Sequence, residues 1–145
     1  MRVTVQEPPF DAATELGGFG GEGMGAIVTF TGIVRDNAQG DLVAMDIEHY
    51  PGMTQSALTQ IATEATRRWS LGDVLVIHRH GRLAPGEQIM MVATASRHRK
   101  DAFEAAEFLM DYLKSRAPFW KKEITRGGAD WVAARDEDEA ALDRW

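Results

Sequence analysis

The sequence has 145 residues, with 16 Lys or Arg against 22 Asp or Glu, so its formal net charge at pH 7 is −6. An acidic chain does not favour nucleic acid as a partner, and the absence of cysteine excludes disulfides, thiolate metal sites and cysteine nucleophiles. No stretch approaches the roughly 18 apolar residues of a membrane-spanning helix, and the first residues, MRVTVQEPPF, lack a signal-peptide core. We expect a cytoplasmic protein with a single domain over residues 1–145.

The N-terminal region predicts a short strand at residues 2–6 and a brief helix from Asp11, a good N-cap residue, to Leu16. A glycine-rich loop follows at residues 17–25 and matches G-x-G-x-x-G. Phosphate-binding loops of that type need a strand before them and a helix after them. Here a strand follows, so we interpret the match as accidental and the segment as a mobile surface loop.

The middle of the chain alternates strand-like and helix-like patterns. AIVTFTGIV, at residues 26–34, predicts a buried strand because it is rich in β-branched residues. Residues 43–50 alternate and are predicted to be its partner strand. A helix is predicted at 53–69, and further strands at 74–80 and 88–95. Two helices packed on a mostly antiparallel sheet of about six strands make the fold class α+β.

The C-terminal region predicts a helix over residues 100–116, because apolar residues recur on one face. Pro118 ends this helix, since its ring disfavours helical geometry at the preceding residue. Residues 119–124 then predict a short strand. The acidic tail at 134–145 is interpreted as a short terminal helix or a partly loose tail.

Basic residues are concentrated around this helix. Eight of the 16 Lys and Arg residues lie between Arg97 and Arg126, which suggests a site for a small anion. Lys114 and Lys121 flank the Pro118 turn, so chain reversal is expected to bring their amines together, and nearby ammonium groups lower each other's pKa. Lys114 also falls at the edge of the apolar stripe, where we expect partial desolvation. A solvated basic edge is the alternative.

His98 and Arg99 lie at the other end of the predicted helix, where unpaired backbone N–H groups favour anions. Sixteen residues separate His98 from Lys114, about 24 Å at ~1.5 Å per residue. No small substrate spans that distance. The two ends therefore serve different sites, or the His98 end of one chain meets the Lys114 end of another.

The other motifs give weaker evidence for a function. His78 and His80 place two imidazoles on one face of a predicted strand, but no clear third ligand accompanies them, so ordinary polar residues are the favoured interpretation. Arg35, just past a predicted core strand, suits phosphate, although a surface ion pair is the commoner role. Motifs for nucleophilic and metal-dependent hydrolysis are absent. We expect no metal and no cofactor.

Several segments together resemble one known family, the large, catalytic subunit of molybdopterin synthase. The two long matches are EHYPGM at 48–53 and MDYLK–RAPFWK across 110–121. Shorter ones are FTG at 30–32, VR at 34–35, IHR at 77–79, and Ser96 with His98 and Arg99. The likeness runs from about residue 26 to residue 145.

The resemblance implies an α/β-hammerhead fold, a homodimer, and a small ubiquitin-like sulfur-carrier subunit at each far end, giving a heterotetramer. The implied reaction converts cyclic pyranopterin monophosphate to molybdopterin by installing two sulfurs as a dithiolene. Each sulfur arrives as a thiocarboxylate on the carrier's C-terminal Gly-Gly. A chain without cysteine cannot carry a persulfide, which agrees with sulfur coming from elsewhere.

The resemblance also implies site residues. Lys114 matches the family's essential lysine and Lys121 the second active-site lysine. The matching substrate-binding positions are Ile33, Val34, Arg35, His98, Arg99, Lys122 and Glu123. Lys114 is expected to act as acid–base or as a transient covalent partner of the carrier's carbonyl, and Lys121 to stabilise negative charge. Two rivals remain open: a non-enzymatic adaptor that binds an anion or a partner's tail, and a phosphate-binding transferase of another pathway.

Overall fold

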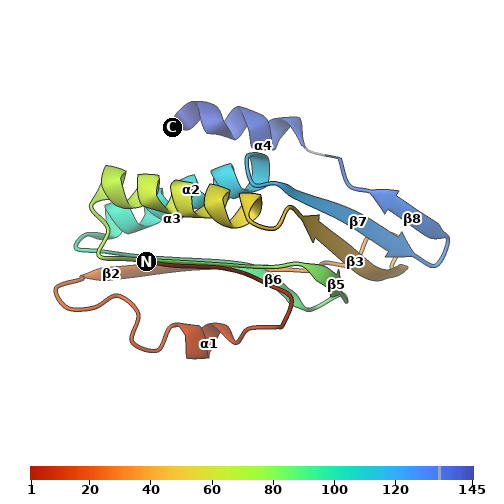
Figure 1. Ribbon diagram of the computed structural model, residues 1–145, viewed down its shortest axis with the longest axis horizontal. Coiled ribbons are helices and arrows are strands. Elements are labelled where there is room, and N and C mark those ends of the chain that lie inside the picture. Colours follow the sequence, from red (N-terminus) through yellow and green to blue (C-terminus); the bar gives the residue numbers. More distant parts are fainter. Residues whose placement is uncertain (134) are drawn as a thin grey trace.

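The computed structural model describes residues 1–133 and 135–145, and these form eight strands in two four-stranded sheets (Figure 1). The first sheet, sheet A, has the order β1 (Arg2–Gln6), β4 (Asp73–Arg79), β6 (Gln88–Ser96), β2 (Ala26–Ile33). The second, sheet B, has the order β5 (Gly81–Leu83), β3 (Leu42–His49), β7 (Phe119–Thr125), β8 (Gly128–Trp131). All strand pairs are antiparallel except β1–β4, so the predicted α+β class is confirmed.

Two long helices, α2 (Met53–Trp69) and α3 (Arg99–Ser115), cover one face of sheet A (Figure 1). They bury an apolar face against it that includes Leu58, Ile61, Phe108 and Leu109. Both helices lie within one residue of their predicted bounds, because helical periodicity and the Pro118 stop are local signals. In the described residues, none of the helices is long and apolar enough to span a membrane.

The opposite face of sheet A is covered by the N-terminal segment. The short helix α1 (Ala12–Glu15) is capped by Asp11, whose carboxylate accepts from the Ala13 N–H at 3.0 Å, as predicted. Phe10, Leu16 and Phe19 pack against buried apolar residues of β4 and β6. Because both faces are covered, these two strands are buried along almost their whole length.

Two predictions about β2 are wrong. It is not buried, because it is an edge strand: Ile27, Phe30 and Ile33 are 50%, 43% and 55% exposed. Nor does it pair with β3. β2 pairs with β6, and residues 34–41 carry the chain out of sheet A into sheet B. Strands that follow one another in the sequence lie in different sheets here, and β2 is rich in apolar residues although it is an edge strand.

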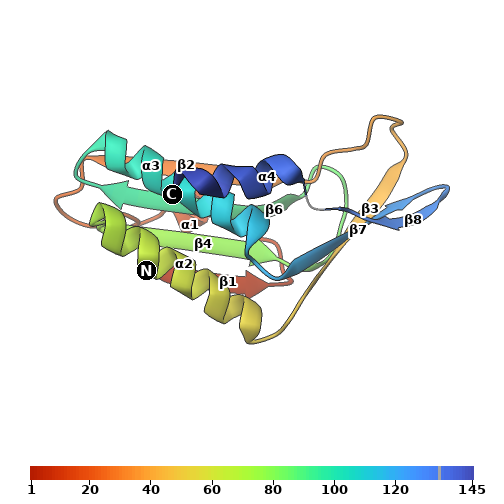
Figure 2. The same ribbon diagram turned by 90° about the horizontal axis from the view of Figure 1, so that it is seen from above.

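The path of α3 fixes which residues lie at each end of the molecule. β2 and β6 are antiparallel, with Ala26 opposite Ser96 and Ile33 opposite Gln88. α3 follows β6 and runs back alongside both strands (Figure 2). The N-terminal end of α3 therefore lies near the start of β2, and its C-terminal end near the end of β2.

The acidic tail folds as helix α4 (Asp136–Ala141) and a 3-10 turn (Leu142–Arg144), which confirms the predicted terminal helix. Arg144 pairs with Glu107 and Asp111 of α3 at 2.7 and 2.6 Å. The Trp145 ring packs against those of Trp69 and Phe108. These contacts hold the C-terminus on the helix layer (Figure 2).

Candidate functional site

The reversal of the chain at Pro118 organises the basic site. α3 ends when the Arg116 N–H donates to the Tyr112 carbonyl at 2.7 Å, and β7 begins at Phe119. The Pro118 carbonyl accepts from the Thr54 hydroxyl at 3.3 Å. This bond ties the turn to the first residues of α2.

The two lysines that flank this turn have different environments. Lys114, in the last turn of α3, is exposed, so the expected desolvation of this side chain is wrong for the single chain. Lys121, on β7, is partly buried. Burial lowers the pKa of Lys121, the charge of Lys114 lowers it further, and Asp138 of α4 opposes both. The reversal therefore brings the two charges close enough to interact, as the spacing predicted. However, the desolvated side chain is that of Lys121 and not that of Lys114.

The register of sheet B sets the direction of Lys121. Lys121 lies opposite Ile47, and Phe119 lies opposite His49. Because alternate strand residues point to opposite faces, these four side chains share one face of the sheet. Ile47 is 2% exposed and belongs to the main core, so this is the inward face.

Three imidazoles gather behind Lys121. His78 is buried and stacks on Phe119, with ring centroids 3.7 Å apart, while the His49 and His80 rings lie 4.3 Å apart. Nδ1–H of His78 donates to the Arg79 carbonyl at 2.7 Å, which leaves the lone pair on Nε2. Burial lowers the pKa of His78 to about 3, and the charges of Lys121, His49 and His80 add to this effect. His78 is therefore neutral at physiological pH.

An aromatic hollow opens on sheet B beside this cluster. It has a volume of about 300 Å³ and is lined by Glu48, His49, Tyr50, Trp120 and Trp131. The Tyr50 and Trp120 rings meet edge to face at 4.7 Å, and Lys122 Nζ lies 4.7 Å from the centre of the Trp131 ring. Sequence reasoning named Lys122 but missed the hollow, since β8 was not predicted.

The remaining predicted residues divide between the two ends of α3. β2 ends at Ile33 near the C-terminal end of α3, so the exposed Arg35, two residues further along, lies towards the Lys114 end. Glu123 lies further along β7, opposite Met45.

His98 and Arg99 lie at the opposite end. His98 is the N-cap of α3, although its side chain makes no capping bond. Within one chain the structure therefore does not bring His98 and Arg99 together with Lys114.

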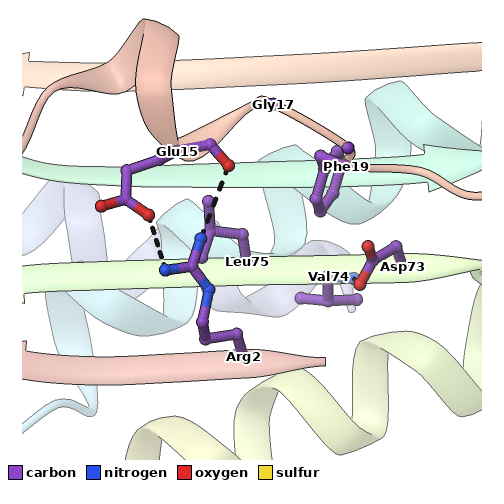
Figure 3. Close-up of a pocket in the computed structure, with 8 residues that line it drawn as sticks. Arg2, Glu15, Gly17, Phe19, Asp73, Val74 and Leu75 are labelled. Carbon is purple, nitrogen blue, oxygen red and sulfur yellow. Dashed lines mark hydrogen bonds and ion pairs between the residues drawn. The ribbon is translucent and has the colours of Figure 1, made fainter.

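A second, smaller cavity of about 180 Å³ lies under the glycine run (Figure 3). Arg2 pairs with Glu15 at 2.5 Å, and Asp73 accepts from the Gly20 N–H at 3.2 Å and pairs with the terminal amine at 3.4 Å. Carboxylates here disfavour a phosphate, which agrees with an accidental glycine motif. The segment packs on sheet A rather than forming a loop apart from it.

No group of three or more His, Asp or Glu side chains in the described residues is arranged to hold a metal ion. His78 donates to the Arg79 carbonyl and stacks on Phe119, and the His80 ring contacts the His49 ring. Their shared strand end is thus an imidazole cluster.

Comparison with known proteins assigns the chain to a family. The family model described as MoaE protein matches residues 5–116. The chain belongs to the MoaE protein family. The chain is 68% identical to the molybdopterin synthase catalytic subunit of Cereibacter sphaeroides, over the full length of both.

Solved structures agree with this family. A molybdopterin biosynthesis MoaE protein from Burkholderia ambifaria superposes with a TM-score of 0.85 at 50% identity, covering 99% of this chain and 97% of that one. A complex of subunits 1 and 2 of molybdopterin-converting factor from Helicobacter pylori shares the fold, with a TM-score of 0.76, 20% identity and coverage of 92% and 91%.

Proposed function

We propose that this chain is the catalytic subunit of a molybdopterin synthase. It transfers two sulfurs from the thiocarboxylated C-terminus of a small carrier subunit to cyclic pyranopterin monophosphate, forming the dithiolene of molybdopterin. The observation that carries the proposal is the full-length match, at 68% identity, to a relative of that name. The partly buried Lys121 beside Lys114 supplies a cation suited to a sulfur that leaves the carrier's acyl carbon as an anion. We expect the protein to work in the cytoplasm.

The two lysines have separate roles in this reaction. Lys114, exposed at the end of α3, is placed to reach the carrier's carbonyl as acid–base or as a transient amide partner. Lys121 stabilises the negative charge that develops as sulfur leaves, because a cation in a partly dry site acts more strongly than one in water.

Substrate recognition falls to the surrounding positions. Arg35, His98 and Arg99 bind the phosphate and the pterin, since guanidinium forks match phosphate oxygens. The backbones of Ile33–Val34 and of Lys122–Glu123 lie alongside. His98 and Arg99 belong to a second copy of the chain, because α3 holds them far from Lys114.

A homodimer through β2 would supply that arrangement. β2 is an edge strand with an open backbone, and Phe30 of β2 and Phe103 of α3 are 43% and 61% exposed. A two-fold axis that pairs β2 with its copy in antiparallel fashion sets the start of one strand opposite the end of the other. The partner's His98 then lies near Arg35 and Lys114.

The aromatic hollow and the open edge of β8 suit an extended peptide tail, which proteins commonly bind by strand addition and side-chain pockets. The Cereibacter relative's name, a catalytic subunit, implies a further subunit, and the Helicobacter neighbour is a complex of two. We therefore assign the hollow and β8 to the carrier, giving a heterotetramer with the homodimer at its centre.

One assay tests the proposal directly. The protein is incubated with thiocarboxylated carrier and cyclic pyranopterin monophosphate, then oxidised, and the fluorescent molybdopterin derivative is measured. We expect product that depends on both additions. Carrier binding without product would refute the proposal and would favour a non-enzymatic adaptor.

A further inference from the structure

Two buried polar atoms stand out around the Pro118 turn. Among the side chains of the described residues, His49 Nδ1 and Ser115 Oγ are buried without a hydrogen-bond partner. Burying such an atom unpaired destabilises the fold, and native proteins leave few of them. Ser115 is the last residue of α3, beside Lys114, and His49 lies opposite Phe119. The two atoms therefore flank the proposed reaction site from both sides of the turn.

His49 links the aromatic hollow to the lysines. It lines the hollow, yet its strand register places its side chain on the same face of sheet B as Lys121. Its ring contacts those of His80 at 4.3 Å and Phe119 at 6.3 Å between centroids. This imidazole therefore lies between the hollow and the face of sheet B that carries Lys121.

That imidazole loses its proton more readily than a free one. Burial, followed by the charge of His80, lowers the pKa of His49. The titratable groups around it are Glu48, which lines the same hollow, His78 from β4, His80 from the link to β5, and Lys121 on the same face of sheet B. Of these groups, His80 lowers the pKa of His49 by its charge, whereas His78 is itself neutral. A neutral imidazole offers one N–H and one lone pair, which suits an uncharged amide better than an anion.

We propose that His49 is a binding residue for the carrier, and that its Nδ1 hydrogen-bonds to a backbone amide of the carrier's extended C-terminal tail between the hollow and Lys121. This inference rests on the proposed function and deepens it. The bond aligns the tail so that its terminal carbonyl reaches the lysines. The cost of the unpaired nitrogen in the free subunit is recovered when the carrier binds.

Three substitutions separate this role from a structural one. His49→Phe keeps an aromatic ring against His80 and Phe119 but removes both nitrogens. His49→Asn places an amide near the position of Nδ1, whereas His49→Gln places it near Nε2. His80→Phe is the matched control, since it preserves the ring contact and leaves Nδ1 of His49 in place.

Carrier affinity is measured by titrating each variant with the carrier in its unthiolated, carboxylate form, and KM for thiocarboxylated carrier by product formation. We expect His49→Phe and His49→Gln to weaken binding and raise this KM about tenfold, the worth of one well-placed hydrogen bond. His49→Asn and His80→Phe should stay within about twofold of wild type. The melting temperature of free His49→Phe should equal or exceed that of wild type, because the unpaired atom is gone.

The opposite results are equally clear. Unchanged carrier affinity in His49→Phe would mean that the carrier forms no hydrogen bond with Nδ1, and it would overturn the inference. So would equal losses in Asn and Gln variants together with a lower melting temperature, the signature of a packing residue. A wild-type chain that makes no product would refute the proposed function instead, whereas an active wild type with an unaffected His49→Phe refutes this inference alone.

Discussion

The two ends of α3 are both basic, yet they are built differently. At the C-terminal end Lys114 stands over a partly buried Lys121, a neutral His78 and two unpaired polar atoms. At the N-terminal end the side chain of His98 makes no capping hydrogen bond within the described residues, Arg99 is exposed, and Phe103 nearby is 61% exposed. The first end shows desolvation and perturbed pKa values, which are typical of chemistry.

The difference indicates a division of labour. Under the proposed function, the C-terminal end would supply the groups that shift protons and stabilise charge, whereas the N-terminal end would offer donors to an anion and an apolar surface to another chain. One helix therefore carries two half-sites, each incomplete. A series of substitutions tests this division, starting with the largest expected effect.

Lys114→Ala should remove product formation, with turnover falling by roughly 100- to 1,000-fold, because acid–base or covalent assistance is lost. The melting temperature and carrier binding should hardly change, since Lys114 is exposed. Lys100→Ala, at the other end of the same helix and 82% exposed in its side chain, is the control and should keep full activity. A collapse in stability with Lys114→Ala would make that lysine structural.

Lys121→Met should lower turnover by about 100-fold while raising stability. Because the folded-state pKa of Lys121 is lowered, the unfolded chain binds this proton more readily, and the ammonium costs stability at neutral pH. In the wild type this cost shrinks as pH rises towards the ordinary lysine pKa of 10.5, so stability rises there. Thermal melts from pH 7 to 10 should show that rise in wild type and not in Lys121→Met, and a less stable variant would contradict the expectation.

Arg35→Ala should raise KM for the pterin phosphate about tenfold with little change in turnover, since a charge-assisted contact to the ground state is removed. Steady-state kinetics with saturating carrier measure this. An unchanged KM with reduced turnover would assign Arg35 to the chemical step.

His78→Phe should reduce the loss of folding stability that occurs as the pH falls below neutral. The pKa of His78 is 6.5 when unfolded and about 3 when folded, so between these values the unfolded chain binds the extra proton. Stability therefore falls as pH drops through this window, by up to about 1.4 kcal/mol per pH unit. Urea unfolding at pH 4, 5 and 6 should show a shallower slope in the variant, which keeps the stack on Phe119. Equal slopes would mean that His78 is protonated in the folded protein.

The sequence predicts some features well because their signals are local. The periodicity of α2 and α3, the Asp11 cap and the stop at Pro118 each depend on a few adjacent residues. The same stop predicted that the charges of Lys114 and Lys121 would interact. His98 and Lys114 were correctly kept apart by helix length alone.

The sequence did not predict the features that depend on contacts between distant strands. The exposure of β2 depends on its place at the sheet edge, and its pairing with β6 spans some sixty residues of chain. His49 and His80 belong to different strands, so only the register of sheet B reveals their contact. The short strands β5 and β8 carry too little periodicity to predict.

The direct test of the divided site is complementation between two inactive chains. His98→Ala and Lys114→Ala proteins are mixed, their subunit exchange is verified, and product formation is measured with carrier and substrate. If each site joins Lys114 of one chain to His98 of the other, random exchange should restore about a quarter of wild-type activity, since half of the dimers are mixed and each has one intact site. No recovery after full exchange would contradict a site shared between chains.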